Sequence, residues 1–340
     1  MSAPSVLVLG GRGRFGLAAA RAFACAGWQV HAQVRPGARH PALRGVEWLP
    51  AAVGDTGALA AAARGSEVVV HALNPAYTRA AWRSRLPMLM RSAIAVGREL
   101  DATLMLPGNV YNFGATMPAL LHEDTPQAAD GLMGRERIAC EQQLAAACGD
   151  GRMKAVVIRA GNFFGSGTGS WLDLVLAKSL PSGRFTYPGA ADVATPWAYL
   201  PDLARSFVRV AERRHQLRAF ETLHFAGHCL TGRDWVRAAQ LIAREQRWIA
   251  PDGRLRVGAL PWALLRLLGL ARPTLRALCD MRYLWDTPHA LANDRLLALI
   301  GEEPHTPFGE ALRTALDDLR LLGTGEAASR GAAPAPGARS

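Results

Sequence analysis

The chain has 340 residues, half of them hydrophobic, and a formal net charge of +11. This length is enough for two domains or for one large α/β unit with a sizeable core. The sequence contains no apolar run of about 20 residues, and its first residues lack the charged and apolar regions of a signal peptide. We therefore expect a cytoplasmic protein without a transmembrane segment.

The spread of the basic residues argues against a nucleic-acid-binding surface, and the spacing of the cysteines argues against a metal site. The arginines are spread along the chain and lysine occurs only at positions 154 and 178, whereas a nucleic-acid-binding surface concentrates its positive charge. We expect no nucleic acid partner. The five cysteines form no C-x-x-C pair, and no cluster of His, Cys and Asp has the spacing of metal ligands. This pattern indicates free thiols in a reducing compartment and no metal site.

A glycine-rich motif follows the first predicted strand, residues 6–9, and opens an alanine-rich helical run over 17–26. In the order strand, glycine turn, helix, the glycines let the backbone approach a pyrophosphate, and the helix N-terminus offers unpaired N–H groups. The motif predicts a dinucleotide site; a glycine turn that only packs is the alternative. The residues predicted to bind the cofactor here are Gly10, Gly11, Arg12, Gly13, Arg14, Phe15 and Gly16.

Strand-like and helix-like segments alternate through the first half of the chain. Strands are predicted over residues 6–9, 29–34, 67–73, 102–106 and 155–158, and helices over 17–26, 57–64, 88–100 and 135–147. This alternation is typical of an α/β protein with a doubly wound parallel sheet, the Rossmann fold. The ligand of such a sheet binds at the carboxyl ends of its strands.

The pattern is less regular beyond residue 159. Helices are predicted over 171–179, 200–213, 235–243 and much of 255–300, and one more strand over 222–226. The step Thr231-x-x-Asp234 resembles a helix start. We expect a dinucleotide-binding domain over 1–160, to which 190–226 returns, a smaller and mostly helical C-terminal substrate region over 161–322, and a disordered tail over 323–340.

Five further motifs occur in a fixed order along the chain. They are Gly54-Asp55, His71-Ala72-Leu73-Asn74, Val110-Tyr111, the segment from Arg159 to Gly165, and the segment from Trp197 to Ala204. With the glycine motif, and over most of residues 5–320, they resemble the extended short-chain dehydrogenase/reductase superfamily, and within it the NAD(P)-dependent epimerase/dehydratase branch.

The resemblance implies roles for several of these positions. It places Asp55 near the adenine and Leu73 and Asn74 beside the nicotinamide ribose. It places Asn162 and Trp197 at the substrate cleft. It further implies a nicotinamide cofactor and a small-molecule substrate, and it is compatible with a homodimer.

The sequence departs from this family at the catalytic pair. In the family, a Tyr-x-x-x-Lys pair acts with a Ser or Thr: the tyrosine transfers a proton, and the lysine lowers the tyrosine pKa and holds the ribose. None of the five tyrosines, at 77, 111, 187, 199 and 283, has a lysine four residues later. Alignment places Met133 at the tyrosine position, Arg137 at the lysine position and Pro107 near the serine position. Glu141 still matches the acidic residue that follows the lysine.

Acid–base chemistry must then come from other residues. Met133 has no exchangeable proton, and Arg137 can hydrogen-bond a ribose but does not exchange protons usefully near neutral pH. Tyr111 and Asn109 are the candidates for the catalytic role, because they lie with Tyr77 on strand-end loops expected to face the nicotinamide. Packing within the loop is the alternative for Tyr111.

The end of the second predicted strand bears on the type of cofactor. Sites that prefer NAD carry an acidic residue there, which binds the ribose 2′-hydroxyl. Residues 30–36 contain no carboxylate, and Arg35 adds positive charge to that of the glycine motif. Because a 2′-phosphate suits such a site better, the sequence favours NADP(H) over NAD(H).

Three kinds of function remain open. The leading one is an oxidoreductase or epimerase that acts on a small or nucleotide-linked substrate with non-standard acid–base residues. The second is an NADP(H)-sensing regulator that has lost catalysis. The third is a structural subunit of a larger assembly, in which the Leu-, Trp- and Arg-rich segment 255–300 forms an amphipathic surface that contacts a membrane or a partner, rather than packing inside the substrate region.

Overall fold

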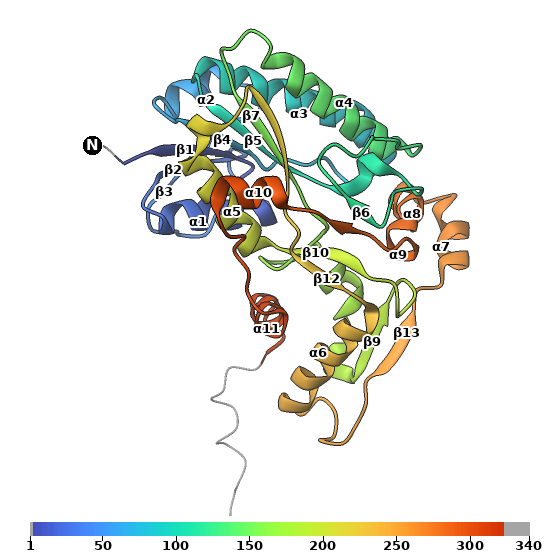
Figure 1. The fold of residues 1–340 in the computed structure, drawn as a ribbon. Coiled ribbons are helices and arrows are strands. Elements are labelled where there is room, and N and C mark those ends of the chain that lie inside the picture. Colours follow the sequence, from blue (N-terminus) through green and yellow to red (C-terminus); the bar gives the residue numbers. More distant parts are fainter. Residues whose placement is uncertain (1–2, 323–340) are drawn as a thin grey trace, which may run out of the picture.

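A parallel sheet of seven strands forms the centre of the molecule, which is a computed structural model that describes residues 3–322 (Figure 1). Its strand order is β11-β7-β5-β4-β1-β2-β3. The strands are β1 (Ser5–Leu9), β2 (Gln29–Val34), β3 (Val46–Pro50), β4 (Val68–His71), β5 (Thr103–Gly108), β7 (Ala155–Arg159) and β11 (Phe220–His224). This order confirms the predicted doubly wound sheet. From β1 the chain first adds β2 and β3 on one side and then adds β4, β5, β7 and β11 on the other. Ligands of such sheets bind at this point, where the strand order reverses.

Helices cover both faces of the sheet, and each face has its own apolar core (Figure 1). Residues of β1 alternate between these cores, because successive side chains of a strand point to opposite faces: Val6 and Val8 join one core, Leu7 and Leu9 the other. One face carries α1 (Arg14–Cys25), α5 (Leu200–Glu212) and α10 (Asp294–Ile300), and the other carries α2 (Thr56–Ala62), α3 (Arg79–Glu99) and α4 (Leu132–Ala147).

The smaller C-terminal region combines short strands with helices around an aromatic core. Its strands are β8 (Asn162–Phe164), β10 (Thr195–Tyr199) and β12 (His228–Leu230) in one sheet, β9 (Arg184–Tyr187) with β13 (Arg256–Ala259), and β14 (Ala290–Leu291) with β6 (Leu120–Leu121). Its helices are α6 (Gly232–Glu245), α7 (Trp262–Gly269), α8 (Pro273–Asp280), α9 (Tyr283–Asp286) and α11 (Phe308–Asp318). Shorter helical turns span Val110–Phe113, Leu172–Leu176, Leu180–Ser182 and Arg214–Gln216.

The structure adds strands that the sequence pattern did not predict. β3 is one, and β13 and β14 lie inside the segment 255–300 that was predicted as helical. Such strands of two to five residues are too short to establish a period of two. The predicted helix start is present, since Thr231 and Asp234 form a capping box before α6. The predicted disordered tail, 323–340, lies outside the described residues.

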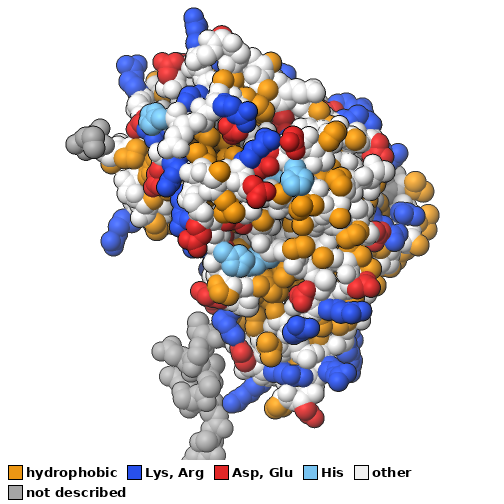
Figure 2. Space-filling view, viewed as in Figure 1, with side chains coloured by type: hydrophobic (Ala, Val, Ile, Leu, Met, Phe, Trp, Pro, Cys, Tyr) orange, Lys and Arg blue, Asp and Glu red, His pale blue; other side chains and the backbone are white. Residues whose placement is uncertain are grey.

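Segments far along the chain complete the main sheet. β11 pairs with β7 at its edge, and α5 packs on α1 with the Phe15 and Phe207 rings 4.8 Å apart. Within residues 3–322 no helix is both long and apolar enough to cross a membrane, and no group of three metal-ligating side chains is found. Basic side chains lie on several parts of the visible surface, with acidic side chains among them (Figure 2).

Candidate functional site

The glycine motif forms a tight turn between β1 and α1. Gly10 has a φ of +81°, and a Cβ on Gly16 would collide with the Gly10 carbonyl oxygen. Gly13 is the N-cap of α1, and no side chain caps the first turn of this helix. The N–H groups of that turn are thus left for an anion. A cradle that a Cβ would fill, beside an uncapped helix N-terminus, fits a dinucleotide pyrophosphate.

Two neighbours hold the glycine turn in place. The Gln33 side chain accepts a hydrogen bond from the Gly10 N–H (3.0 Å) and donates one to the Ala51 carbonyl oxygen (2.8 Å). The Leu73 side chain packs directly against Gly10. Leu73 therefore lies at the glycine turn, and its place beside a nicotinamide ribose stays a prediction. The sequence analysis did not single out Gln33. A polar residue at the end of a strand that is otherwise buried could have indicated its role.

The charged residues of the predicted cofactor site differ in their surroundings. Arg12 and Arg35 are exposed, and neither forms an ion pair among the described residues. Arg14 is turned toward the C-terminal region, where its Nη2 donates to the Phe163 carbonyl oxygen (3.0 Å). Burial lowers the pKa of Arg14 to about 10, against an opposing effect of Asp173. Asp55 caps α2 by accepting a hydrogen bond from the Ala58 N–H.

A second group of residues gathers at the carboxyl ends of β4 and β5. Arg137, on α4, donates a hydrogen bond to the Asn74 side chain (3.0 Å), and its guanidinium carbon lies 5.2 Å from the centroid of the Trp82 ring. The Arg137 Nε is buried without a partner in the described part of the chain. Arg137, which the sequence alignment places at the family's lysine position, thus carries, beside Asn74, a buried N–H donor without a partner within residues 3–322. Trp82 was not predicted: it lies in the first turn of α3 (Arg79–Glu99), before the helix expected from the sequence over 88–100.

Two tyrosine hydroxyl groups meet beside Arg137. The hydroxyl oxygens of Tyr77 and Tyr111 are 3.4 Å apart, and Asn109 caps the turn that carries Tyr111 by accepting its N–H (3.0 Å). Burial raises the pKa of Tyr111, while the Tyr77 hydrogen bond and the Arg137 charge oppose that shift. Burial raises the pKa of Tyr77 well above its ordinary value. Both hydroxyl groups are therefore protonated near neutral pH.

The residue that the sequence alignment places at the family's tyrosine position is buried. Met133 is 2% exposed and belongs to the apolar core between the sheet and helices α3 and α4. Nearby, burial and the positive charge of Arg137 lower the pKa of His71 to about 3. Neither ring nitrogen of His71 has a hydrogen-bond partner among the described residues. Near neutral pH this histidine is a neutral, buried group at the end of β4.

The two predicted substrate residues lie on adjacent strands but differ in exposure. Asn162 and Trp197 are register partners in the β8–β10 pair. Asn162 is half-buried, whereas Trp197 is fully buried and donates its indole N–H to the Thr195 hydroxyl (3.1 Å). Trp197 thus forms part of the aromatic core, with Trp235 and Trp285 around it. Their role toward a substrate stays a prediction.

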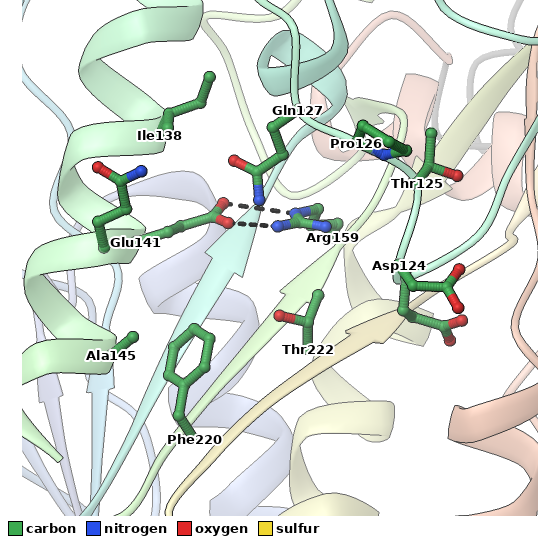
Figure 3. A pocket seen from close by; sticks show the side chains of 12 residues that line it. Asp124, Thr125, Pro126, Gln127, Ile138, Glu141, Ala145, Arg159, Phe220 and Thr222 are labelled. Atoms are coloured by element: carbon green, nitrogen blue, oxygen red, sulfur yellow. Dashed lines mark hydrogen bonds and ion pairs between the residues drawn. The ribbon is translucent and has the colours of Figure 1, made fainter. Parts of the chain in front are cut away.

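A pocket of about 410 Å³ is lined by residues 123–127, by α4, by β7 and by the edge strand β11. Figure 3 shows Arg159 of β7 and Glu141 of α4 pointing toward one another at its wall, joined by an ion pair. Both side chains are almost fully buried. This pair fixes α4 against the sheet one helical turn beyond Arg137.

Comparison with known proteins identifies the family. The model of the NAD dependent epimerase/dehydratase family matches residues 6–224, and the chain belongs to this family. The predicted resemblance is thereby confirmed. No curated protein sequence matches the chain significantly.

Three solved structures share the fold over most of the chain. A candidate epimerase of Burkholderia cenocepacia J2315 aligns with a TM-score of 0.72 at 21% identity, covering 93% of this chain and 98% of its own. MoeE5, solved with UDP-glucose and NAD, has a TM-score of 0.68 at 15% identity, covering 93% and 98%. The UDP-glucose 4-epimerase of Brucella ovis, solved with NAD, has a TM-score of 0.62 at 18% identity, covering 78% and 92%. At these identities the likeness establishes the fold.

Proposed function

We propose that this protein is a nicotinamide-dependent oxidoreductase or epimerase in which Tyr111 replaces the family's catalytic tyrosine. The observation that carries the proposal is the pair of hydroxyl groups of Tyr77 and Tyr111, 3.4 Å apart beside Arg137. The family and the uncapped glycine turn support a nicotinamide cofactor. Two of the three similar structures described above hold NAD, and one of these also holds UDP-glucose, so a small or nucleotide-linked substrate is part of the proposal.

Each residue of the site would have its own role in the reaction. A bound nicotinamide supplies or accepts hydride. Arg137 and Asn74 would hold the adjoining ribose by hydrogen bonds. Tyr111 would donate the proton from its hydroxyl group to the substrate oxygen as the carbonyl carbon receives hydride, and a proton from water would then restore the Tyr111 hydroxyl. The Tyr77 hydroxyl would orient Tyr111 through their hydrogen bond. Because burial raises the pKa of Tyr111, its hydroxyl group keeps its proton near neutral pH and is in the state needed to protonate a carbonyl oxygen.

Exposed arginines support a preference for NADP(H) within this proposal. Arg35 is exposed just beyond β2, and the end of that strand carries the buried residues Gln33 and Val34 in place of a carboxylate. Arg12 is exposed in the glycine turn. MoeE5 and the Brucella ovis enzyme were solved with NAD, so the preference depends on these residues of the chain alone.

A cofactor-sensing regulator is the second candidate. It is favoured by Met133, which the sequence alignment places at the family's tyrosine position, because methionine has no exchangeable proton to donate. In such a protein Arg137 would hold the cofactor, and no chemistry would follow. The cofactor site would then have been retained for binding alone.

The deciding experiment measures NADPH oxidation across a panel of carbonyl compounds, with UDP-glucose isomerisation assayed in parallel. Wild type is compared with Tyr111→Phe, and with Met133→Leu as a volume-conserving control. Loss of a general acid is expected to reduce the rate roughly 10²–10⁴-fold in Tyr111→Phe, with little change in Met133→Leu. Cofactor binding without turnover would favour the regulator. Turnover unaffected by Tyr111→Phe would reject this choice of residue.

A further inference from the structure

The exposed apolar side chains of the molecule are concentrated in one segment. Of the nine large hydrophobic residues that stand out as exposed in the described chain, five lie between residues 257 and 270. Leu270 and Leu267 are 79% and 64% exposed, which is unusual for leucine. Contiguous exposed apolar patches of this kind mark interaction sites in folded proteins.

Helix α7 presents these leucines outward in a regular way. Leu264, Leu267 and Leu268 stand at positions i, i+3 and i+4 of the helix and therefore share one face. The other face is anchored: Trp262 is buried and donates its indole N–H to the Pro188 carbonyl oxygen (2.7 Å), and Gly269 packs against the backbone of α8 at Arg276. The leucines are exposed because the helix is held by its opposite side.

The same segment carries a strong positive charge. Residues 254–286 contain six arginines and two aspartates. Both aspartates are already neutralised, Asp280 by Arg79 and Asp286 by Arg282. Five of the arginines are exposed and have no carboxylate partner within residues 3–322: Arg254, Arg256, Arg266, Arg272 and Arg276. Figure 2 shows hydrophobic and basic side chains together at the right-hand edge of the molecule, where Figure 1 places α7.

We propose that this surface binds the headgroup region of an anionic lipid bilayer. We call it the leucine–arginine face and define it by Leu264, Leu267, Leu268, Leu270, Arg266, Arg272 and Arg276. Apolar side chains of such a face enter the boundary between headgroups and acyl chains, and its arginines attract anionic lipids. A second copy of the chain is a poorer occupant, since a twofold interface would bring the same unpaired arginines together.

The test measures co-sedimentation of the full chain with lipid vesicles. One set contains phosphatidylcholine alone, and the other contains about one third phosphatidylglycerol. We expect binding to the anionic vesicles, weakened as salt rises from about 0.1 M to about 0.5 M. Leu267→Ser with Leu270→Ser should lower the partition coefficient at least about tenfold, because the inserted apolar area is lost. Arg272→Glu with Arg276→Glu should remove the preference for anionic vesicles.

Matched controls separate this face from general charge and hydrophobicity. Leu241→Ser changes a leucine of similar exposure on α6, and Arg21→Glu with Arg64→Glu changes two exposed arginines elsewhere; all should bind vesicles nearly as wild type does. Absence of vesicle binding, or equal loss in the controls, would overturn the proposal. So would a dimer in light scattering that dissociates in the Leu267→Ser, Leu270→Ser variant, since the face would then belong to a second copy.

Discussion

Arg14 of the glycine turn donates a hydrogen bond from its Nη2 to the carbonyl oxygen of Phe163, 3.0 Å away and 149 positions later in the chain. A second, longer bond runs from its Nε to the Gly165 carbonyl oxygen (3.4 Å). The side chain therefore joins the start of α1 to the segment after β8. One guanidinium group thus links the first turn of α1 to the start of the C-terminal region.

This link predicts a stability effect for Arg14→Met. Loss of a charged hydrogen-bond donor to buried carbonyl oxygens should lower the free energy of unfolding by about 1.5–3 kcal/mol. The matched control is Arg12→Met, which changes an exposed arginine two residues away and should stay within about 0.5 kcal/mol of wild type. Urea unfolding of the three proteins measures the difference. Equal stability of both variants would show that the Arg14 hydrogen bonds contribute nothing.

The second prediction concerns the choice between cofactors. If Arg35 contacts a 2′-phosphate, Arg35→Ala should weaken NADPH binding at least about tenfold, the effect of losing a charge-assisted hydrogen bond. NADH binding should be nearly unchanged. Arg21→Ala, an exposed arginine on the middle of α1, serves as the charge control. Calorimetric titration decides the matter, and a wild type that binds NADH as tightly as NADPH would refute the preference.

Periodicity in the sequence predicts the main sheet well, because each buried strand and amphipathic helix carries its own local signal. β2 is found with the same bounds as predicted, and α4 and α5 nearly so. The short strands are different: β3 and β14 exist because a neighbouring strand pairs with them, which no local pattern records. Tertiary contacts also decide the surroundings of a side chain. The sequence could name Arg14 but not Phe163 as its partner, and it could not show that Met133 packs into the core.

The third prediction is a pH profile for the proposed reduction. Burial raises the pKa of Tyr111, so the hydroxyl stays protonated up to a pH above its ordinary pKa of about 10. Loss of this proton should therefore lower the rate of carbonyl reduction only above about pH 10. Tyr77→Phe removes a hydrogen bond that lowers the Tyr111 pKa, and it should move the break to higher pH. A break near neutral pH that Tyr77→Phe leaves unmoved would assign the acid to another group.

The last prediction concerns stability in acid. Burial and Arg137 lower the pKa of His71 to about 3 in the folded protein, against about 6.5 in the unfolded chain. Below pH 6.5 the unfolded chain binds the proton and the folded protein does not, so stability falls as the pH falls, by about 2 kcal/mol near pH 5 for this residue.

His71→Leu removes a ring whose nitrogens have no partner within residues 3–322, so it should keep full stability at neutral pH. The loss of stability between neutral pH and pH 5 should then be about 2 kcal/mol smaller than in wild type. His122→Leu, which changes an exposed histidine, is the control. Urea unfolding at the two pH values measures the loss, and an unchanged pH dependence in His71→Leu would show that His71 does not titrate on unfolding.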